Sequence, residues 1–147
     1  MEDKEKDFLN AVYQNSKTGM LSIKDIIDEV KDQELSNELN REYGEYERLA
    51  SKCETYASNE NLDIKDNNFM EKAKLWTSIK MTTMMDKSTR HITEMLLLGT
   101  VMGLNQCYKD KFDFKNVNQD IAQLLQNLEE MEENNYEKLK GFLKKEI

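Results

Sequence analysis

The spacing of apolar residues along this chain is typical of long amphipathic helices. Apolar positions recur three and four residues apart in every long segment. We predict helices over residues 4–30, 34–58, 88–108 and 117–145. The link over residues 31–33 is so short that the first two helices must form an antiparallel hairpin.

Two polar stretches predict changes of chain direction. Residues 59–67, NENLDIKDN, predict a loop, and a further helix is expected over residues 68–86. That helix ends at a break before Ser88, which is a suitable N-cap for the next helix. Residues 109–118 predict the second turn, where Phe112 and Phe114 are expected to cover one end of the core.

The helix that begins at Ser88 is expected to be the centre of the fold. It is apolar nearly all round, so we expect it to lie among the other helices and not on their rim. Gly99 and Gly103 are expected to form a notch where a neighbouring backbone comes close. Gly19 lies inside the first helix at a cost of about 1 kcal/mol relative to alanine, which indicates close packing, a bend or an unconstrained surface position.

The composition indicates an all-α protein. The 147 residues include no proline and only five glycines, which favours long helices joined by short turns. A chain of this length is expected to form one domain over residues 1–147 and to bury roughly two-thirds of its unfolded surface. Disorder is not expected, because the hydrophobic 38% of the chain is periodic.

Charge and hydropathy narrow the classes of partner. The formal net charge of -8 makes nucleic acid and anionic membranes poor partners, because both require clustered Lys and Arg. The apolar run over residues 95–104 is about half of the length that spans a bilayer, and the N-terminus is charged where a signal peptide is apolar. We therefore expect no transmembrane segment and a cytoplasmic location. Cys53 and Cys107 belong to no CxxC pair and are expected to be buried thiols.

Two stretches of the sequence resemble a known group of proteins. LNAVYQNSKTGMLSIKDII at residues 9–27 and WTSIKMTTMMDKSTRHITEMLLLGTVMGL at residues 76–104 are similar to uncharacterised ferritin-like helical proteins of Gram-positive anaerobic bacteria. The resemblance runs over nearly the whole chain. It implies an antiparallel, ferritin-like four-helix bundle with an additional crossover helix around Trp76, and it implies no established activity. Di-iron members of the wider class use two Glu-x-x-His motifs, whereas this chain has one histidine, in the reversed order His91-Ile92-Thr93-Glu94.

His91 and Glu94 are the starting point of a candidate metal site. They stand three residues apart and share one helix face, so one helix can offer an imidazole and a carboxylate to the same ion. If that helix runs parallel to the second one, as the ferritin-like topology requires, a rise of about 1.5 Å per residue places the pair level with Glu42 and Glu45. The same layer takes in Asp25 or Asp28 of the first helix and Glu132 or Asn135 of the last. The predicted ligands of iron or another divalent metal are Glu42, Glu45, His91, Glu94 and Glu132.

The same residues also have an interpretation without a metal. A single His beside a Glu is more often a surface or boundary pair, and the acidic residues 129–133 are expected to be a solvated face. The sequence contains no GxSxG, HExxH, CxxC or Gly-rich phosphate loop, so no catalytic residue is assigned.

Two functional hypotheses follow. The first is a non-enzymatic helical bundle of structural, stress-related or spore-associated type, without a cofactor, that acts as a homo-oligomer or through a protein partner. The alternative is a ferritin-like metal-binding protein with the degenerate carboxylate and histidine site described above.

Overall fold

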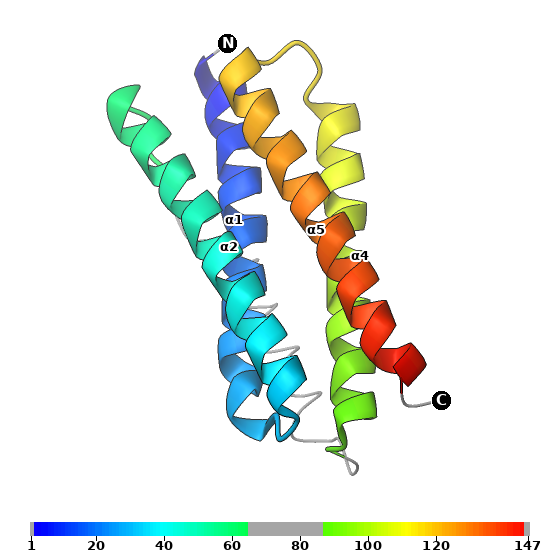
Figure 1. Ribbon diagram of the computed structural model, residues 1–147. Coiled ribbons are helices and arrows are strands. Elements are labelled where there is room, and N and C mark those ends of the chain that lie inside the picture. Colours follow the sequence, from blue (N-terminus) through cyan, green and yellow to red (C-terminus); the bar gives the residue numbers. More distant parts are fainter. Residues whose placement is uncertain (1, 65–86, 146–147) are drawn as a thin grey trace.

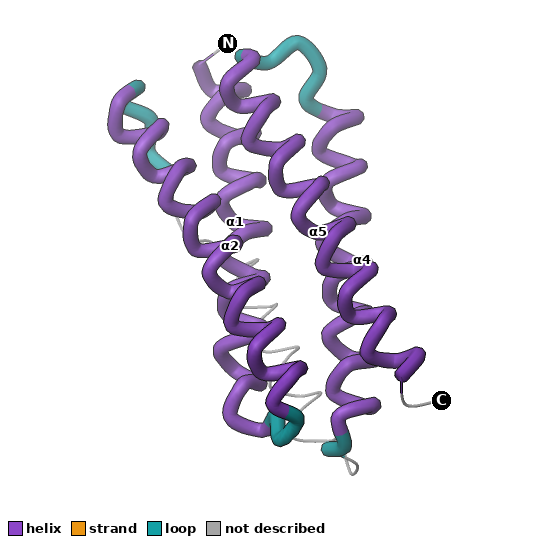
Figure 2. The backbone as a smooth tube through the Cα atoms, viewed as in Figure 1, coloured by secondary structure: helices purple, strands orange, loops and turns teal. Residues whose placement is uncertain are grey.

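The computed structural model describes residues 2–64 and 87–145, which form four long helices (Figure 1). The elements are α1 (Glu2–Ile26), the short 3-10 helix η1 (Ile27–Glu29), α2 (Gln33–Asn59), α4 (Thr89–Asp113) and α5 (Gln119–Lys145). Figure 2 shows only helix and loop in these ranges, in agreement with the predicted all-α class. The helix expected over residues 68–86, with its crossover role around Trp76, lies outside the described residues.

The four described helices form a bundle in which neighbouring helices are antiparallel. α1 packs chiefly against α2, and α4 chiefly against α5, while smaller contacts join α1 to α4 and α2 to α5. In Figure 1, α1 and α5 run in one direction, and α2 and α4 run in the other. The parallel helices are therefore the diagonal pairs, and every pair of neighbours runs in opposite directions.

The turn between α1 and α2 confirms the predicted hairpin but moves its first boundary. α1 ends at Ile26 and not at Val30, since Val30 is already extended, with ψ of 116°. Asp32 follows as the N-cap of α2, and its carboxylate accepts a hydrogen bond of 2.8 Å from the backbone N–H of Leu35. An N-cap residue needs extended backbone, so the helix must stop before it.

The second turn is shorter than predicted. Ser88 is the N-cap of α4, as expected, and accepts a hydrogen bond of 3.3 Å from the backbone N–H of His91. α4 continues to Asp113, and only residues 114–118 turn the chain before Asn118 caps α5. Asn116 has φ of 65°, a left-handed conformation that asparagine tolerates better than most residues.

All four described helices contribute to one hydrophobic core. Its fully buried apolar side chains include Phe8, Leu9, Val12, Ile26, Leu35, Leu39, Ile92, Ile121, Leu128 and Leu139. At one end of the core Phe114 stacks on Phe8, with ring centroids 4.9 Å apart, as predicted for a covering residue. Phe112 does not share this role, because it is 71% exposed. Cys53 and Cys107 are buried free thiols, as predicted.

The prediction that the helix beginning at Ser88 lies at the centre of the fold was wrong. α4 packs against α5 and α1 on one side, and Leu98, Val101 and Met102 are exposed on the other. The predicted backbone notch is also absent: a β-carbon at Gly99 would meet nothing within 4 Å, and Gly103 faces the side chain of Glu132. Gly19 does permit close packing, because a β-carbon there would lie 2.6 Å from the ring of Tyr46.

Candidate functional site

A group of polar side chains is buried in the middle of the bundle. We call Asn15, Glu42, Tyr46, Glu132 and Asn135 the central polar cluster; none of them is more than 8% exposed. Asn15 comes from α1, Glu42 and Tyr46 from α2, and the last two from α5. Burying carboxyl and amide groups costs free energy unless they are hydrogen-bonded or neutralised, so this cluster needs a physical explanation.

The α2 part of the cluster is organised by Arg41. Its guanidinium donates two hydrogen bonds to Glu38, of 2.6 and 3.0 Å, and a further one to Glu45. It also reaches across to α5 and donates a hydrogen bond of 3.1 Å to the side-chain oxygen of Asn135. The spacing of three and four residues places Glu38, Arg41 and Glu45 on one helix face, where such contacts form readily.

Glu42 is held as a neutral acid. Burial, together with its hydrogen bond to Glu38, raises the pKa of Glu42 to about 10. Burial also tends to raise the pKa of Glu38, but hydrogen bonds from Arg41 and Glu42 outweigh it and lower that pKa. At neutral pH the protonated Glu42 therefore donates to the Glu38 carboxylate. Its second oxygen makes no hydrogen bond within the described part of the chain.

Glu132 is the member of the cluster whose burial is least offset by hydrogen bonds. It is 1% exposed, and neither carboxyl oxygen has a hydrogen-bond partner among the described residues. Its carboxyl group lies against Gly103 of α4, where any larger residue would occupy the same space. Burial raises the pKa of Glu132 well above its ordinary value, which favours the neutral acid in the folded state.

The surroundings of Glu132 contain two further groups that resist ionisation. Burial, and then the nearby carboxyl of Glu132, raise the pKa values of Tyr46 and of Cys107. Asn15 donates hydrogen bonds to the backbone oxygen of Gly103, at 3.1 Å, and to Cys107 Sγ, at 3.5 Å. The centre of the bundle is thus polar but uncharged, with the charged Arg41, Glu38 and Glu45 at its edge.

The structure brings together only part of the predicted metal site. Glu42 and Glu132 both belong to the central polar cluster, and Glu45 is bound by Arg41 at its edge. His91 and Glu94 are exposed near the start of α4, where they contact Ser88 and Arg90 at 3.1 and 3.2 Å. No group of three or more His, Cys, Asp or Glu residues within the described ranges is arranged to hold a metal ion.

The register of α4 explains why His91 and Glu94 stand apart from the others. Glu132 is level with Gly103, and His91 precedes Gly103 by roughly 18 Å along the helix at 1.5 Å per residue. The predicted layer assumed that residues near the start of α4 face Glu42. Of the other candidates for that layer, Asn135 lies in the cluster, whereas Asp28 is exposed.

Sequence reasoning named Glu42, Glu132 and Asn135 as site candidates but missed Asn15 and Tyr46, and it did not use the spacing that buries these residues. Glu132 and Asn135 continue the apolar stripe of Leu128 and Leu139 at intervals of four, three and four residues. The expectation of a solvated face over residues 129–133 was therefore wrong for Glu132. It was also wrong for Glu129, which is buried and lies 3.6 Å from Lys111. Asn15 likewise follows Phe8 and Val12 at helical spacing.

The second candidate site is a surface. We call Leu98, Val101, Met102, Tyr108 and Phe112 the outer face of α4; these are the large hydrophobic residues that the described structure leaves exposed. Isolated exposed apolar residues are ordinary, but these five follow one helix. A contiguous apolar surface of this kind marks an interaction site in a folded protein.

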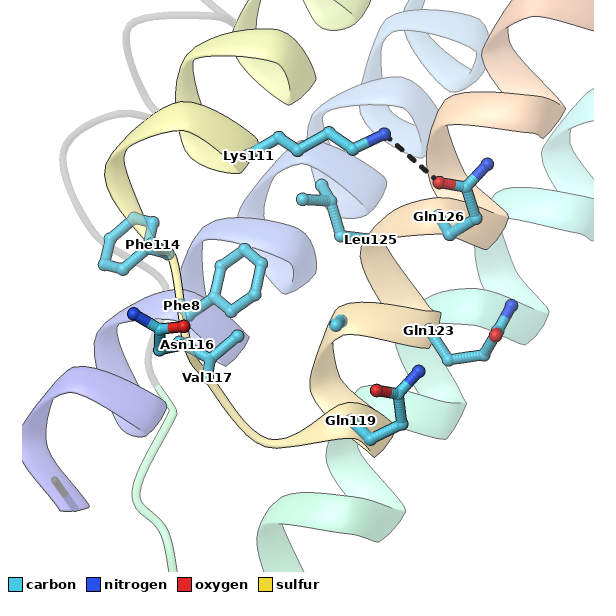
Figure 3. A pocket seen from close by; sticks show the side chains of 10 residues that line it. Phe8, Lys111, Phe114, Asn116, Val117, Gln119, Gln123, Leu125 and Gln126 are labelled. Atoms are coloured by element: carbon cyan, nitrogen blue, oxygen red, sulfur yellow. Dashed lines mark hydrogen bonds between the residues drawn. The ribbon is translucent and has the colours of Figure 1, made fainter.

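A hollow of about 280 Å³ lies beside the turn between α4 and α5 (Figure 3). Phe8, Phe114 and Val117 form one side, and the amides of Gln119, Gln123 and Gln126 follow the other. The charged group on its rim, Lys111, is occupied by Gln126 at 3.3 Å and by Glu129. The hollow therefore offers packing and amide hydrogen bonds but no titratable or nucleophilic group aimed into it.

Comparison of the chain with family models, curated proteins and solved structures found no match. Among the helices that the structure describes, none is long and apolar enough to cross a membrane.

Proposed function

We propose that this chain is a non-enzymatic, ferritin-like helical bundle that acts through self-association, in a structural, stress-related or spore-associated role. The observation that carries the proposal is the outer face of α4. Large apolar side chains gathered on one helix surface lower the solubility of a monomer, and a second copy would remove them from water. A different protein partner is the competing outcome that the test must separate.

The ferritin-like part of the proposal is supported by the helix directions. α2 and α4 run the same way (Figure 1). Ferritin-like bundles have a long crossover at this point. The proposal assigns that crossover to the helix expected around Trp76.

A cytoplasmic location is part of the same proposal. Cys53 and Cys107 are both free, and thiols persist in reducing compartments. Fractionation of the source cells, with immunodetection of the chain, tests the location directly.

Self-association is tested by sedimentation velocity of the full chain over a series of concentrations. The wild type is expected to move from monomer towards dimer as the concentration rises, and Leu98→Asp is expected to remain a monomer. Ser51→Asp is the matched control, because it makes the same charge change at an exposed position on α2, which is diagonal to α4. A wild type that stays monomeric throughout would contradict the proposal.

The central polar cluster supports a second candidate, the binding of iron or another divalent cation. Glu132 has two buried oxygens without a donor among the described residues, and Glu42 has one, which a cation would satisfy. The ligand set would be the carboxyl oxygens of Glu42 and Glu132, because carboxylate oxygens suit hard divalent ions. His91 and Glu94 are not part of this set.

Metal content per chain separates this candidate from the first. Protein purified without chelator is reloaded with Fe(II), Mn(II) and Zn(II), and the bound metal is counted by plasma mass spectrometry. Near-stoichiometric metal that is lost in Glu132→Gln and retained in His91→Ala would support the cation site. If the wild type retains no more metal than Glu132→Gln, the candidate fails.

A further inference from the structure

The outer face of α4 has the spacing of a helix-pairing seam. Leu98, Val101, Asn105, Tyr108 and Phe112 follow one another at alternating intervals of three and four residues, and all five are exposed. This alternation is the pattern by which two helices pack along a common line. The opposite side of the helix carries the buried residues Ile92, Leu96, Thr100, Leu104 and Cys107. One face of α4 therefore packs in the core, and the opposite face is directed to water.

The apolar part of the seam is large enough to form the centre of an interface. Leu98 is 52%, Met102 53% and Phe112 71% exposed. An aromatic side chain presents roughly 150–250 Å², so the exposed parts of Tyr108 and Phe112 alone offer on the order of 200 Å², to which Leu98, Val101 and Met102 add. A stable interface of standard size buries about 800 Å² on each partner, with a polar rim around an apolar centre. The outer face of α4 would form the apolar centre of such an interface, and its flanking charges the polar rim.

The charges that flank the seam indicate which partner and orientation fit. Glu94 lies two helical turns before Val101, and Lys109 lies two turns after Met102, so the two charges are equally far from the middle of the seam. Lys109 is exposed. Glu94 is exposed too and lies 3.2 Å from Arg90 of the same helix, so the pair that it would form with a second copy shares its carboxylate with Arg90. Two parallel copies would place Glu94 beside Glu94 and Lys109 beside Lys109. Two antiparallel copies would place Glu94 beside Lys109 twice.

We propose that two copies of this chain pair through α4 in antiparallel orientation, about a two-fold axis near Val101 and Met102, with Glu94 of each copy beside Lys109 of the other. The inference rests on the proposed function, because it names the partner and geometry of that self-association. A second copy is favoured as the partner over another protein, because an antiparallel copy of α4 places a positive charge opposite Glu94 and a negative charge opposite Lys109. An isologous contact of this kind closes into a dimer and leaves no free seam.

Cysteine cross-linking tests the orientation. Val101→Cys is expected to form an intermolecular disulfide on treatment of the full chain with diamide, because the two sulfurs lie near the axis. Leu98→Cys is the matched control: it lies on the same seam and is exposed, but in antiparallel copies its two sulfurs are far apart. Cys53 and Cys107 do not compete, since both are buried. Cross-linking of Leu98→Cys as efficiently as Val101→Cys would overturn the antiparallel geometry.

Charge reversal tests the contact between Glu94 and Lys109. Glu94→Lys and Lys109→Glu are each expected to weaken the dimer, raising its Kd roughly five- to tenfold, since two symmetric pairs become repulsive. The double variant is expected to regain the wild-type Kd. Mixing the two single variants is expected to yield a heterodimer in preference to either homodimer. If the single variants associate as tightly as the wild type, the contact is absent.

The outcomes separate this inference from the proposed function on which it rests. Suppose that the wild type dimerises, that Leu98→Asp abolishes the dimer, and that Leu98→Cys cross-links as efficiently as Val101→Cys. Self-association through α4 is then supported, and the antiparallel pairing is overturned. A wild type that is monomeric at every concentration overturns both. Circular dichroism of each variant shows whether the fold is retained, so that a loss of association is not mistaken for unfolding.

Discussion

The carboxyl group of Glu132 occupies the space that a side chain at Gly103 would need. A β-carbon built on Gly103 would lie 3.0 Å from the carboxyl carbon of Glu132 and nearer still to one of its oxygens. This contact between α4 and α5 is what allows a carboxyl group to reach the centre of an otherwise apolar bundle. It also sets the register of α4, and so determines which of its residues face the core.

Gly103→Ala is therefore expected to destabilise the protein by about 1–3 kcal/mol, since either Glu132 or α4 has to move in a packed interior. Gly99→Ala is the matched control on the same helix, and a β-carbon there meets nothing within 4 Å. That change is expected to stabilise the protein by up to about 1 kcal/mol through helix propensity. Urea denaturation of both variants measures the two effects, and equal effects would contradict the contact.

The central polar cluster makes a prediction about pH. Glu42, with its pKa raised to about 10, and Glu132, with its pKa raised by burial, keep their protons in the folded state. In the unfolded chain both lose them near pH 4.3. Stability is therefore fully present below that pH and falls as the pH rises towards the folded-state pKa values, by about 1.4 kcal/mol per pH unit for each group.

The charged neighbours do not reverse this trend. The charge of Arg41 favours the ionised form of Glu42, but burial outweighs it and the pKa of Glu42 stays raised. Glu38, whose pKa is lowered, changes stability only below its ordinary pKa. Glu132→Gln is expected to make the free energy of unfolding fall less steeply as the pH rises above about 4.3, because the raised pKa of Glu132 keeps its proton in the folded state after the unfolded chain has lost it. Glu133→Gln, its exposed neighbour, is expected to leave the slope unchanged, and a slope equally reduced in both variants would count against a neutral Glu132.

The general fold was predictable from the sequence because it depends on local patterns. Helical spacing located α1, α2, α4 and α5 to within a few residues, and the short link before Gln33 required a hairpin. Ser88 was recognisable as a cap by its position before an apolar run. The errors lay at helix ends, where a few hydrogen bonds decide the boundary: α1 gives way to η1 after Ile26, and α4 continues to Asp113.

The candidate site was less predictable, because it depends on how neighbouring helices are aligned along their lengths and on which side of each helix faces the core. A helix that is apolar nearly all round does not reveal its inner face, so the sequence did not show that Met102 faces water. Only the contact of Glu132 with Gly103 shows that His91 belongs to a different layer. Glu42 and Glu132 were named from their expected height along the bundle, but the same argument also placed Glu94 in their layer, where the structure does not have it.

Thiol reactivity tests the uncharged character of the core. Burial raises the pKa of Cys53 to about 12, and the pKa of Cys107 is also raised by burial, helped by the nearby Glu132. Because the thiolate is the reactive form, both thiols are expected to react with Ellman's reagent at pH 8 at least a hundredfold more slowly than in the unfolded chain. An exposed reference thiol, introduced as Ser51→Cys, is expected to react at the ordinary rate. Rapid labelling of either native thiol would show that the core opens.

The two faces of α4 are tested by one substitution made on each side. Leu104 is 9% exposed on the inner face and Leu98 is 52% exposed on the outer face, so the pair differs in burial but not in chemistry. Leu104→Ala is expected to lower the free energy of unfolding by about 2–4 kcal/mol, through lost burial and the cavity that remains. Leu98→Ala is expected to change it by less than about 0.5 kcal/mol when measured at a concentration where the chain is monomeric.

The concentration dependence of the same two variants connects stability to function. If the outer face pairs with a second copy, the wild type gains stability as protein concentration rises, because association stabilises the folded state by mass action. The melting temperature of Leu98→Ala is expected to equal that of the wild-type monomer and not to rise with concentration. The melting temperature of Leu104→Ala is expected to be lower at every concentration but still to rise with it. Melting temperatures recorded over a concentration series distinguish the two variants. A wild-type melting temperature that does not depend on concentration would leave the outer face of α4 without a role in self-association.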